Sequence, residues 1–380
     1  MKDNREYDKK LVTKINNKEY TETRDGLEVH VKPVPDDERP HAMDPRLYQI
    51  AAKKKEMFAS RSKAANGGFR LSNERYRPDK ITYDLNTVPI DTDERLISVD
   101  DDHMIDIFIY RRHDDKDKTL PLMIYLHGGG FTAGDYHLYE KQMKLVAELG
   151  HVCVMFPEYR LAPETPFPGA IHDCHASIEY MYNNAKELNI NREKIMVAGD
   201  SAGGNLTNCC VLLDNKKIIK KIFELYPGWD SRKLNDIKEY TWSYSKYQML
   251  EEQKDIVLSR IDRIKKSADQ DSNTPDLYRQ NKTTADDKFI SPYLAENDKL
   301  KQFPKTIICA SEFDYLRIQD EAAARKLQEL GVDVTYVEYA GCDHGFLDCL
   351  GKVVQAEEAC QYMANEARTI CTNNHNTKTT

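Results

Sequence analysis

The residues K-I-M-V-A-G-D-S-A-G-G, at positions 194–204, decide the fold that we predict for this chain. The apolar-rich first half predicts a strand, and a helical pattern opens directly after the glycines. The G-x-S-x-G pentapeptide between them places Ser201 at the apex of a sharp strand-to-helix turn, with its hydroxyl clear of the sheet. Gly199 and Gly203 flank the apex, because a side chain at either position would clash across the turn. Ser201 is therefore the candidate nucleophile.

The context of this pentapeptide matters more than the pentapeptide itself. Five-residue patterns recur by chance, and the simplest alternative is a glycine turn that carries an ordinary serine. The preceding strand and the following helix favour the nucleophile, since the start of a helix directs N–H groups and partial positive charge at a nearby anion. A dinucleotide-binding interpretation fits less well, because the G-x-G-x-x-G spacing is absent.

A second glycine motif indicates where negative charge would be stabilised. His127-Gly128-Gly129-Gly130-Phe131 directly follows the apolar run 120–126. Consecutive glycines allow the chain to turn with its N–H groups pointing into one cavity. Acyl transfer needs such donors where charge develops on the carbonyl oxygen, and each is worth roughly 3–4 kcal/mol. The N–H of Ala202, just after the nucleophile, is the second expected source. His127 is expected to support the loop.

The serine hydroxyl also needs a general base, and histidine is the side chain whose ordinary pKa suits neutral pH. His344 is the best candidate. It lies in G-C-D-H-G-F, residues 341–346, directly after the last strand pattern of the chain. His172 and His175 instead lie on a predicted helix.

The acid that orients this histidine should lie on the loop after the preceding strand. That strand ends at Ala310, and Ser311-Glu312-Phe313-Asp314 follows. Asp314 is favoured over Glu312, which precedes it, and over Asp320, which lies in the following helix. The chain order serine, aspartate, histidine is that of α/β-hydrolases and differs from other serine hydrolase folds.

The rest of the chain supports an α/β architecture. From about Arg95, short β-rich runs alternate with longer helical patterns, which is typical of a mostly parallel sheet covered by helices. The first two strands should form a hairpin, because only a short acidic turn separates them. We predict strands at 96–99, 104–110, 120–126, 152–156, 194–198, 219–225, 305–310 and 332–338, and helices at 138–149, 170–188, 203–213, 319–330 and 352–367.

One long stretch, residues 230–287, interrupts this alternation. It is rich in charge and in aromatic side chains, among them Tyr240, Trp242, Tyr244 and Tyr247. Insertions of this length in a compact domain are usually functional, so we expect a lid over the site. The alternative is a solvated helical excursion without a role in binding.

Composition bounds the class of protein and its surroundings. The chain has 380 residues, a net charge of -8 and no run of the ~20 apolar residues that a membrane-spanning helix needs. We therefore expect no nucleic-acid partner and no stable membrane insertion. The nine cysteines are odd in number and form no C-x-x-C pair, and several of them lie in apolar runs. Together with a charged N-terminus that does not look like a secretory signal, they predict a cytoplasmic protein.

Taken together, the motifs resemble the hormone-sensitive-lipase family of α/β-hydrolase esterases. The resemblance covers roughly residues 85–350. It rests on six motifs in fixed order: H-G-G-G-F (127–131), Y-R-L-A-P-E (159–164), P-F-P-G-A (166–170), G-D-S-A-G-G-N (199–205), S-P-Y-L (291–294) and D-H-G-F (343–346). The chain departs from the family in two respects. The usual D-P-L-R-D-E around the acid is replaced by D-Y-L-R-I-Q-D-E at 314–321, and the cap regions are unusually charged.

The resemblance implies an eight-stranded, mostly parallel sheet flanked by helices, with a helical cap. Residues 1–85 and 230–287 would supply the cap, while 86–229 and 288–380 would form the hydrolase core. It also implies that Gly129, Gly130 and Ala202 donate the oxyanion-hole hydrogen bonds, that Gly128 shapes the turn, and that Asp200 belongs to the supporting motif.

The function expected from these residues is hydrolysis of small to medium carboxylic esters through an acyl-enzyme on Ser201, without metal or cofactor. Three alternatives stay open: a deacetylase or amidase with the same triad, a lyase of the dehydratase type, and a non-catalytic small-molecule receptor. The receptor is disfavoured, because all three triad residues are present. The oligomeric state is left open, a homodimer being one option.

Overall fold

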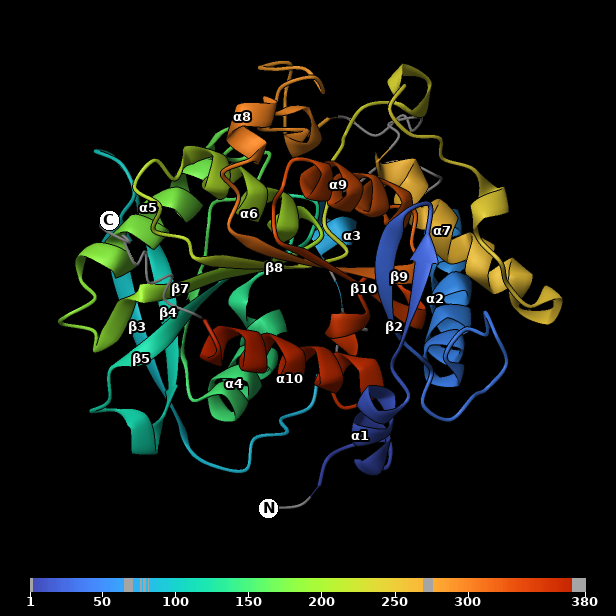
Figure 1. The fold of residues 1–380 in the computed structure, drawn as a ribbon, viewed down its shortest axis with the longest axis horizontal. Coiled ribbons are helices and arrows are strands. Elements are labelled where there is room, and N and C mark those ends of the chain that lie inside the picture. The colour runs from blue at the N-terminus through green and yellow to red at the C-terminus, as the bar shows by residue number, and fades with distance from the viewer. Residues whose placement is uncertain are drawn as a thin grey trace, which may run out of the picture.

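A single twisted sheet forms the centre of the molecule (Figure 1). The computed structural model describes residues 3–64, 71–75, 77, 80, 82–268 and 276–370. The sheet has ten strands in the order β1-β2-β10-β9-β8-β7-β5-β6-β4-β3. The strands are β1 (Tyr20–Arg24), β2 (Leu27–Lys32), β3 (Ile90–Ser98), β4 (Met104–Arg112), β5 (Leu120–Leu126), β6 (Cys153–Pro157), β7 (Ile190–Asp200), β8 (Lys221–Leu225), β9 (Lys305–Phe313) and β10 (Val334–Asp343).

Helices cover both faces of this sheet. In Figure 1, α4 and α10 lie on one face, and α5, α6 and α9 lie on the other. The helices are α1 (Lys10–Asn17), α2 (Pro45–Ala64), α3 (Leu71–Arg75), α4 (Tyr136–Gly150), α5 (Gly169–Asn183), α6 (Ala202–Leu213), α7 (Lys254–Ala268), α8 (Asn297–Leu300), α9 (Arg317–Glu329) and α10 (Val354–Arg368).

The predicted α/β-hydrolase architecture is confirmed. All eight predicted strands are present as β3–β10, and all five predicted helices are present as α4, α5, α6, α9 and α10. The expected hairpin is the antiparallel pair β3–β4, and the strands from β2 across to β6 run parallel.

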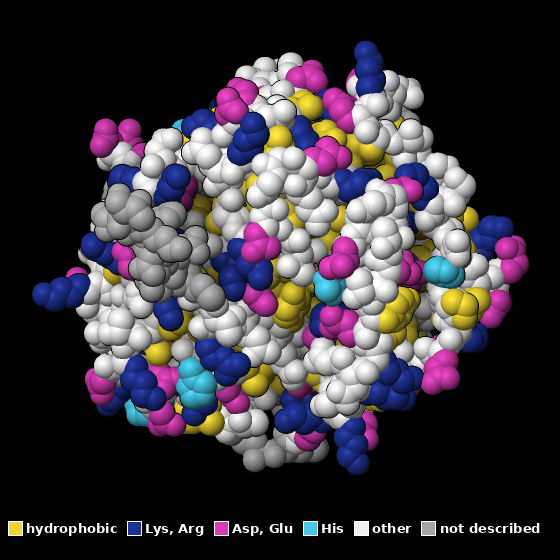
Figure 2. Space-filling model, viewed as in Figure 1, with side chains coloured by type: hydrophobic (Ala, Val, Ile, Leu, Met, Phe, Trp, Pro, Cys, Tyr) yellow, Lys and Arg dark blue, Asp and Glu magenta, His cyan; other side chains and the backbone are white. Residues whose placement is uncertain are grey.

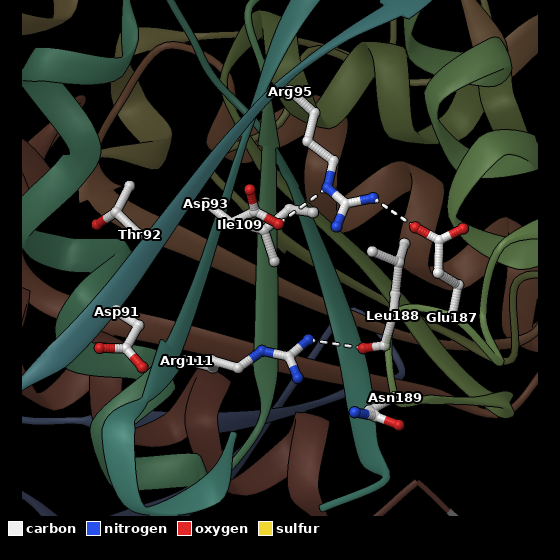
Figure 3. Close-up of a pocket in the computed structure, with 9 residues that line it drawn as sticks. All are labelled: Asp91, Thr92, Asp93, Arg95, Ile109, Arg111, Glu187, Leu188 and Asn189. Atoms are coloured by element: carbon white, nitrogen blue, oxygen red, sulfur yellow. Dashed lines mark hydrogen bonds and ion pairs between the residues drawn. The ribbon is translucent and has the colours of Figure 1, made fainter. Parts of the chain in front are cut away.

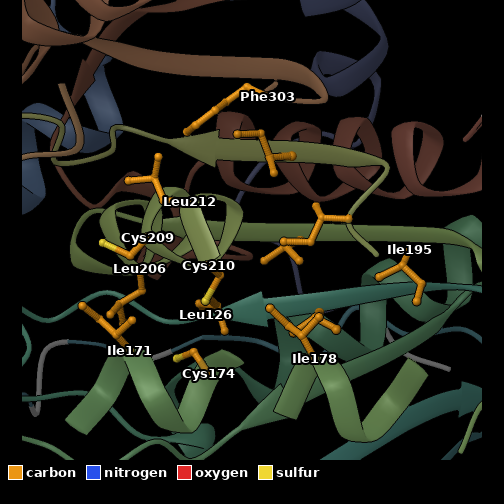
Figure 4. Packing of buried hydrophobic residues seen from close by; sticks show 14 of the residues in the cluster. Leu126, Ile171, Cys174, Ile178, Ile195, Leu206, Cys209, Cys210, Leu212 and Phe303 are labelled. Carbon is orange, nitrogen blue, oxygen red and sulfur yellow. The ribbon is translucent and has the colours of Figure 1, made fainter. Parts of the chain in front are cut away.

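Alternation along the central strands builds a core on each face of the sheet. On β5, Leu122, Ile124 and Leu126 join the cluster under α5 and α6, whereas Met123 and Tyr125 join the cluster under α4 and α10. This follows from the two-residue period of a strand, which turns successive side chains to opposite faces. Figure 4 shows the first cluster, where α5 and α6 press small and branched side chains against the sheet; among them are Ile171, Cys174, Ile178, Leu206, Cys209 and Cys210.

The N-terminal segment requires a correction. Residues 1–85 were expected to be a cap piece and the sheet to have eight strands, yet β1 and β2 extend the sheet beyond β10. The reason lies in the pattern L-E-V-H-V, whose Leu27, Val29 and Val31 are buried and whose intervening residues are more exposed. A half-buried strand of this kind satisfies its backbone groups by pairing with β10.

Buried charge fixes the hairpin in place. Arg24, on β1, donates two hydrogen bonds to Glu338 of β10, at 2.6 and 3.0 Å, and one to Glu321 of α9 at 2.9 Å. Arg317 lies 3.5 Å from the same Glu338 carboxylate. Burial opposes ionisation of Glu338, but Arg24 and Arg317 outweigh it and hold the pKa of Glu338 below its ordinary value. The hairpin is thus held by charges that are removed from water.

The surface outside this network is mixed in charge. On the face in Figure 2, Lys and Arg side chains alternate with Asp and Glu, and hydrophobic side chains are scattered between them. Among the helices in the described residues, none is long and apolar enough to cross a membrane. Every cysteine that the structure describes is free and buried.

The Arg24 network makes the first prediction. Arg24→Ala should lower the free energy of unfolding by about 1–3 kcal/mol, because it leaves a buried carboxylate with a weaker partner. Since the pKa of Glu338 is lowered by folding, this stabilisation is present above the ordinary glutamate pKa and is lost as the pH falls through the lowered value. Urea unfolding at several pH values measures it. Arg39→Ala is the control, because Arg39 is 55% exposed and pairs with Asp37 at the surface; an equal effect of both variants would contradict the account.

Candidate active site

Ser201 lies at a strained turn between β7 and α6. Its backbone has φ 54° and ψ -117°, a conformation that residues other than glycine rarely adopt. The turn is held by its own hydrogen bonds: the Ser201 N–H donates to the Leu225 carbonyl at 2.9 Å, and the N–H of Gly228 donates to the Ser201 carbonyl at 3.1 Å. Both partners lie at or beyond the end of β8, so the neighbouring strand stabilises the unusual conformation.

Glycine is required beside this serine because the backbone passes too close for a side chain. A Cβ at Gly199 would lie 2.4 Å from the Gly203 carbonyl oxygen, and a Cβ at Gly203 would lie 1.9 Å from the Leu126 oxygen. The second contact brings the start of α6 directly against the end of β5. This close packing of α6 against β5 places Ser201 beside the glycine-rich loop that follows β5.

The structure brings Ser201, His344 and Asp314 together. The His344 Nε2 lies 2.8 Å from the Ser201 Oγ, and its Nδ1 lies 2.6 Å from the Asp314 Oδ2. The Asp314 side chain is fully buried, and the His344 side chain is 11% exposed. The three residues come from the ends of β7, β9 and β10, because the carboxyl ends of parallel strands meet at one edge of a sheet.

The two other carboxylates considered for this position lie elsewhere. Glu312 accepts the N–H of Gly341 at 2.7 Å and lies 2.7 Å from the Nδ1 of His41. Asp320 is buried on α9 without a hydrogen-bond partner among the described residues, and burial raises its pKa well above the ordinary value. Although the sequence after Asp314 departs from the family pattern, Asp314 still contacts His344. Gln319, in this altered stretch, accepts hydrogen bonds from the N–H groups of Trp229 and Asp230.

The glycine-rich loop after β5 faces the serine. Gly129 has φ 135° and Gly130 has φ 64°, and both values favour glycine. No hydrogen bond within the described residues uses the N–H groups of Gly129, Gly130 or Ala202. These donors are thus left available for a ligand.

Asp200 joins this loop to the serine turn. Its carboxylate accepts the Gly128 N–H at 2.7 Å, the Tyr125 hydroxyl at 2.9 Å and the Tyr139 hydroxyl at 3.2 Å. A Cβ at Gly128 would lie 2.4 Å from the Asp200 Oδ2, so only glycine fits there. Burial, with repulsion from Asp348, raises the pKa of Asp200 to about 6. The motif residue expected to support the site is therefore a buried acceptor that positions the loop.

His127 contacts the glycine-rich loop. Its Nδ1 lies 2.9 Å from the Gly128 carbonyl, and its ring stacks on Tyr159 with centroids 4.2 Å apart. The Tyr159 hydroxyl donates to the His127 carbonyl at 2.6 Å. Burial lowers the pKa of His127 to about 4, so the ring is neutral at physiological pH. His127 lies in the supporting layer and not in the relay of Ser201.

The 230–287 insertion supplies contacts that sequence reasoning missed. The Tyr247 hydroxyl donates to the Asp314 carbonyl at 2.8 Å, and the Trp242 Nε1 donates to the Tyr315 carbonyl at 3.2 Å. On α7, Arg260 pairs with the buried Asp343, and Arg263 donates to the His344 carbonyl at 3.1 Å. The richness of the insertion in aromatic and charged residues is the sequence signal of these contacts, and it does not indicate the partners.

Two pockets have linings that do not include Ser201, His344 or Asp314. One, of about 200 Å³, lies between the β3–β4 hairpin and residues 187–189. Figure 3 shows that its charges are satisfied internally: Arg95 binds Asp93 and Glu187, and Arg111 donates to the Leu188 carbonyl. The other, of about 490 Å³, lies behind the glycine-rich loop, between Gly134 and Thr165. Within the described ranges, no cluster of His, Cys, Asp and Glu could hold a metal ion.

Comparison with known proteins places this geometry in a family. Residues 123–348 match the family model described as alpha/beta hydrolase fold. The chain therefore belongs to this family, and the predicted kinship with the hormone-sensitive-lipase group of esterases is confirmed.

Individual relatives agree with that assignment. A protein of Acanthamoeba polyphaga mimivirus, named as an alpha/beta hydrolase, is 28% identical over 327 residues, which cover 79% of this chain and 84% of that protein. An arylesterase of Saccharolobus solfataricus is 30% identical over 233 residues, 60% of this chain and 68% of that one. Among solved structures, a thermophilic carboxylesterase cloned from a metagenomic library aligns with a TM-score of 0.61 at 27% identity, covering 78% of this chain and 93% of that one.

The Asp200 bridge makes the second prediction. Asp200→Ala should lower kcat for ester hydrolysis by about 10²-fold, the cost of one misplaced oxyanion donor, because the Gly128 N–H and two tyrosine hydroxyls lose their acceptor. Asp200→Asn keeps one acceptor oxygen and should retain more of the activity. Steady-state kinetics with a p-nitrophenyl ester measures both, with circular dichroism to verify folding. Equal activity of the alanine variant and the wild type would contradict this role.

The contact between the insertion and the acid loop makes the third prediction. Tyr247→Phe removes one hydroxyl from the Asp314 carbonyl, and a hydrogen bond is worth about 1 kcal/mol, so kcat should fall roughly fivefold. Tyr244→Phe removes a hydroxyl that binds Asp262 on the surface of the same insertion and should leave kcat unchanged. The pair is compared under identical conditions, and a larger loss in the Tyr244 variant would show that the account is wrong.

Proposed function

We propose that this chain hydrolyses small to medium carboxylic esters through an acyl-enzyme on Ser201. The observation that carries the proposal is the continuous relay from Ser201 Oγ through His344 to Asp314, with distances of 2.8 and 2.6 Å. Relatives of the same family are named esterases and carboxylic ester hydrolases. Ester hydrolysis is accordingly the activity of this protein.

In the first half of the proposed reaction, Ser201 Oγ attacks the ester carbonyl carbon while His344 Nε2 accepts the hydroxyl proton. Asp314 holds the imidazole in the required tautomer and stabilises the imidazolium that forms. The tetrahedral intermediate collapses, the bond to the alcohol oxygen breaks, and His344 returns the proton to the leaving alcohol. The acyl group remains on Ser201.

In the second half, water takes the place of the alcohol. His344 accepts a proton from the water, which attacks the acyl carbonyl, and then returns that proton to Ser201 Oγ as the carboxylic acid leaves. Charge on the carbonyl oxygen in both halves would be stabilised by the N–H groups of Gly129, Gly130 and Ala202, which make no hydrogen bonds within the described residues. The starting geometry needs no rearrangement of the three side chains.

The insertion and the helices after β2 would form the cap over this site. Within the described residues, α7 of the insertion packs against α2 (Figure 1). At the far end of the insertion, Tyr278 stacks on Phe131 of the glycine-rich loop, with ring centroids 3.9 Å apart. The cap therefore touches both the histidine side and the oxyanion side of the site. Residues 86–229 and 288–380 remain the proposed core.

The compartment proposed for this protein is the cytoplasm. The described cysteines are all free and buried, and neighbouring thiols such as Cys209 and Cys210 show no disulfide. Reduced thiols of this kind fit a reducing compartment.

Covalent labelling tests the proposed nucleophile. A fluorophosphonate probe should label the wild type at one site, because an activated serine attacks the phosphorus. Ser201→Ala should abolish labelling and lower turnover of p-nitrophenyl acetate by about 10⁵-fold or more. Ser245→Ala, at an exposed position of the insertion, is the matched control and should label as the wild type does. A folded wild type that fails to label would favour a receptor, and a Ser201→Ala protein that still labels would exclude this serine.

A further inference from the structure

The guanidinium of Arg263 lies beside the catalytic histidine. Its guanidinium donates to the His344 carbonyl at 3.1 Å, and its side chain is accessible to solvent. In the described part of the chain it forms no ion pair. Asp343, the nearest acid along the chain to His344, is already paired with Arg260, and Asp314 faces the His344 ring.

Charges of both signs act on Arg263. Desolvation by the protein around it, together with repulsion from Arg260 and Arg77, outweighs the attraction of Asp343 and Asp314 and lowers the pKa of Arg263 to about 10. The positive charges of Arg77 and Lys80 also help to lower the pKa of His127, which contacts the glycine-rich loop. Lys80 itself pairs with Asp348. Basic residues near the site therefore come from the N-terminal segment as well as from α7. The protein as a whole has a net charge of -8.

The hydrogen bond to the His344 carbonyl does not by itself require a cation. A neutral amide side chain could donate it, whereas the guanidinium of Arg263 is repelled by that of Arg260. Only one of the five N–H groups of Arg263 has a recorded acceptor. The remaining groups form a planar fork that matches a carboxylate.

We propose that the ester substrate carries a second, ionised carboxylate and that Arg263 binds it while Ser201 attacks the ester bond. This inference rests on the proposed esterase function and names its substrate class: half-esters of dicarboxylic acids, or esters whose alcohol part carries an acid. A single guanidinium without a direct ion pair matches a singly charged carboxylate. Arg263 is thereby a specificity-determining residue supplied by the insertion.

The test compares two esters with acyl chains of equal length, mono-p-nitrophenyl glutarate and p-nitrophenyl valerate. The wild type should show a higher kcat/KM for the charged ester, and the preference should weaken as salt is added. Arg263→Gln should lower the charged-to-neutral ratio of kcat/KM by about tenfold, chiefly through KM for the charged ester. A weaker hydrogen bond to the His344 carbonyl should lower kcat for both esters by the same factor, up to about fivefold, and this factor cancels from the ratio.

Two further variants make the comparison specific. Arg263→Lys keeps the charge and should retain part of the preference. Lys266→Gln removes one positive charge from the exposed side of the same helix and should leave the ratio unchanged. Circular dichroism verifies that each variant is folded.

The outcomes separate this inference from the proposed function. If Arg263→Gln lowers kcat/KM for both esters by the same factor, Arg263 only positions His344 and the inference is overturned. An unchanged ratio overturns it as well. If the wild type hydrolyses neither ester, the proposed esterase function is wrong and the inference is wrong with it. If the wild type hydrolyses p-nitrophenyl valerate but does not prefer mono-p-nitrophenyl glutarate, only the inference is overturned.

Discussion

The buried carboxylate of Asp200 is the interaction on which the rest of the site depends. It lies directly before the candidate nucleophile and binds the N–H of Gly128, so the serine turn and the oxyanion loop are fixed relative to each other by one side chain. The direct contact between Gly203 and the end of β5 leaves no room for adjustment. Two loops that are 72 residues apart in the sequence thus behave as one rigid unit. Electrostatic stabilisation of a transition state requires such prior positioning, since donors that must reorganise lose most of their value.

The second half of the site is held in a different way. Asp314 and His344 follow β9 and β10, and their backbones are bound by side chains of the 230–287 insertion, Tyr247 and Arg263. The sheet therefore brings the relay together, while the insertion fixes its acid and base. If the insertion forms the proposed cap, the same segment would border the substrate and contact the backbones of Asp314 and His344. This arrangement also gives a physical reason why a charge on α7 would influence which ester is accepted.

The core and the candidate relay could be predicted because their signals are local. Ser201 is indicated by a strand, a glycine turn and a helix in eleven consecutive residues, and His344 and Asp314 each follow a recognisable strand. The sequence does not predict that the hairpin β1–β2 joins the sheet. Its strands are rich in charge, and they are held by pairing with β10 and by the hydrogen bonds of Arg24 to the distant Glu338. The contacts of Arg260, Arg263 and Tyr247 were likewise missed, since each joins positions more than 60 residues apart. Long-range pairing of this kind leaves no periodicity in the sequence.

The most direct test of the central claim is to trap the covalent intermediate. The protein is mixed rapidly with p-nitrophenyl acetate, quenched in acid during the first turnover, digested and mapped by mass spectrometry. The account predicts one acetyl group, carried by the peptide that contains Ser201. An acetyl group on any other residue, or a burst of p-nitrophenol without an acetylated peptide, would contradict it.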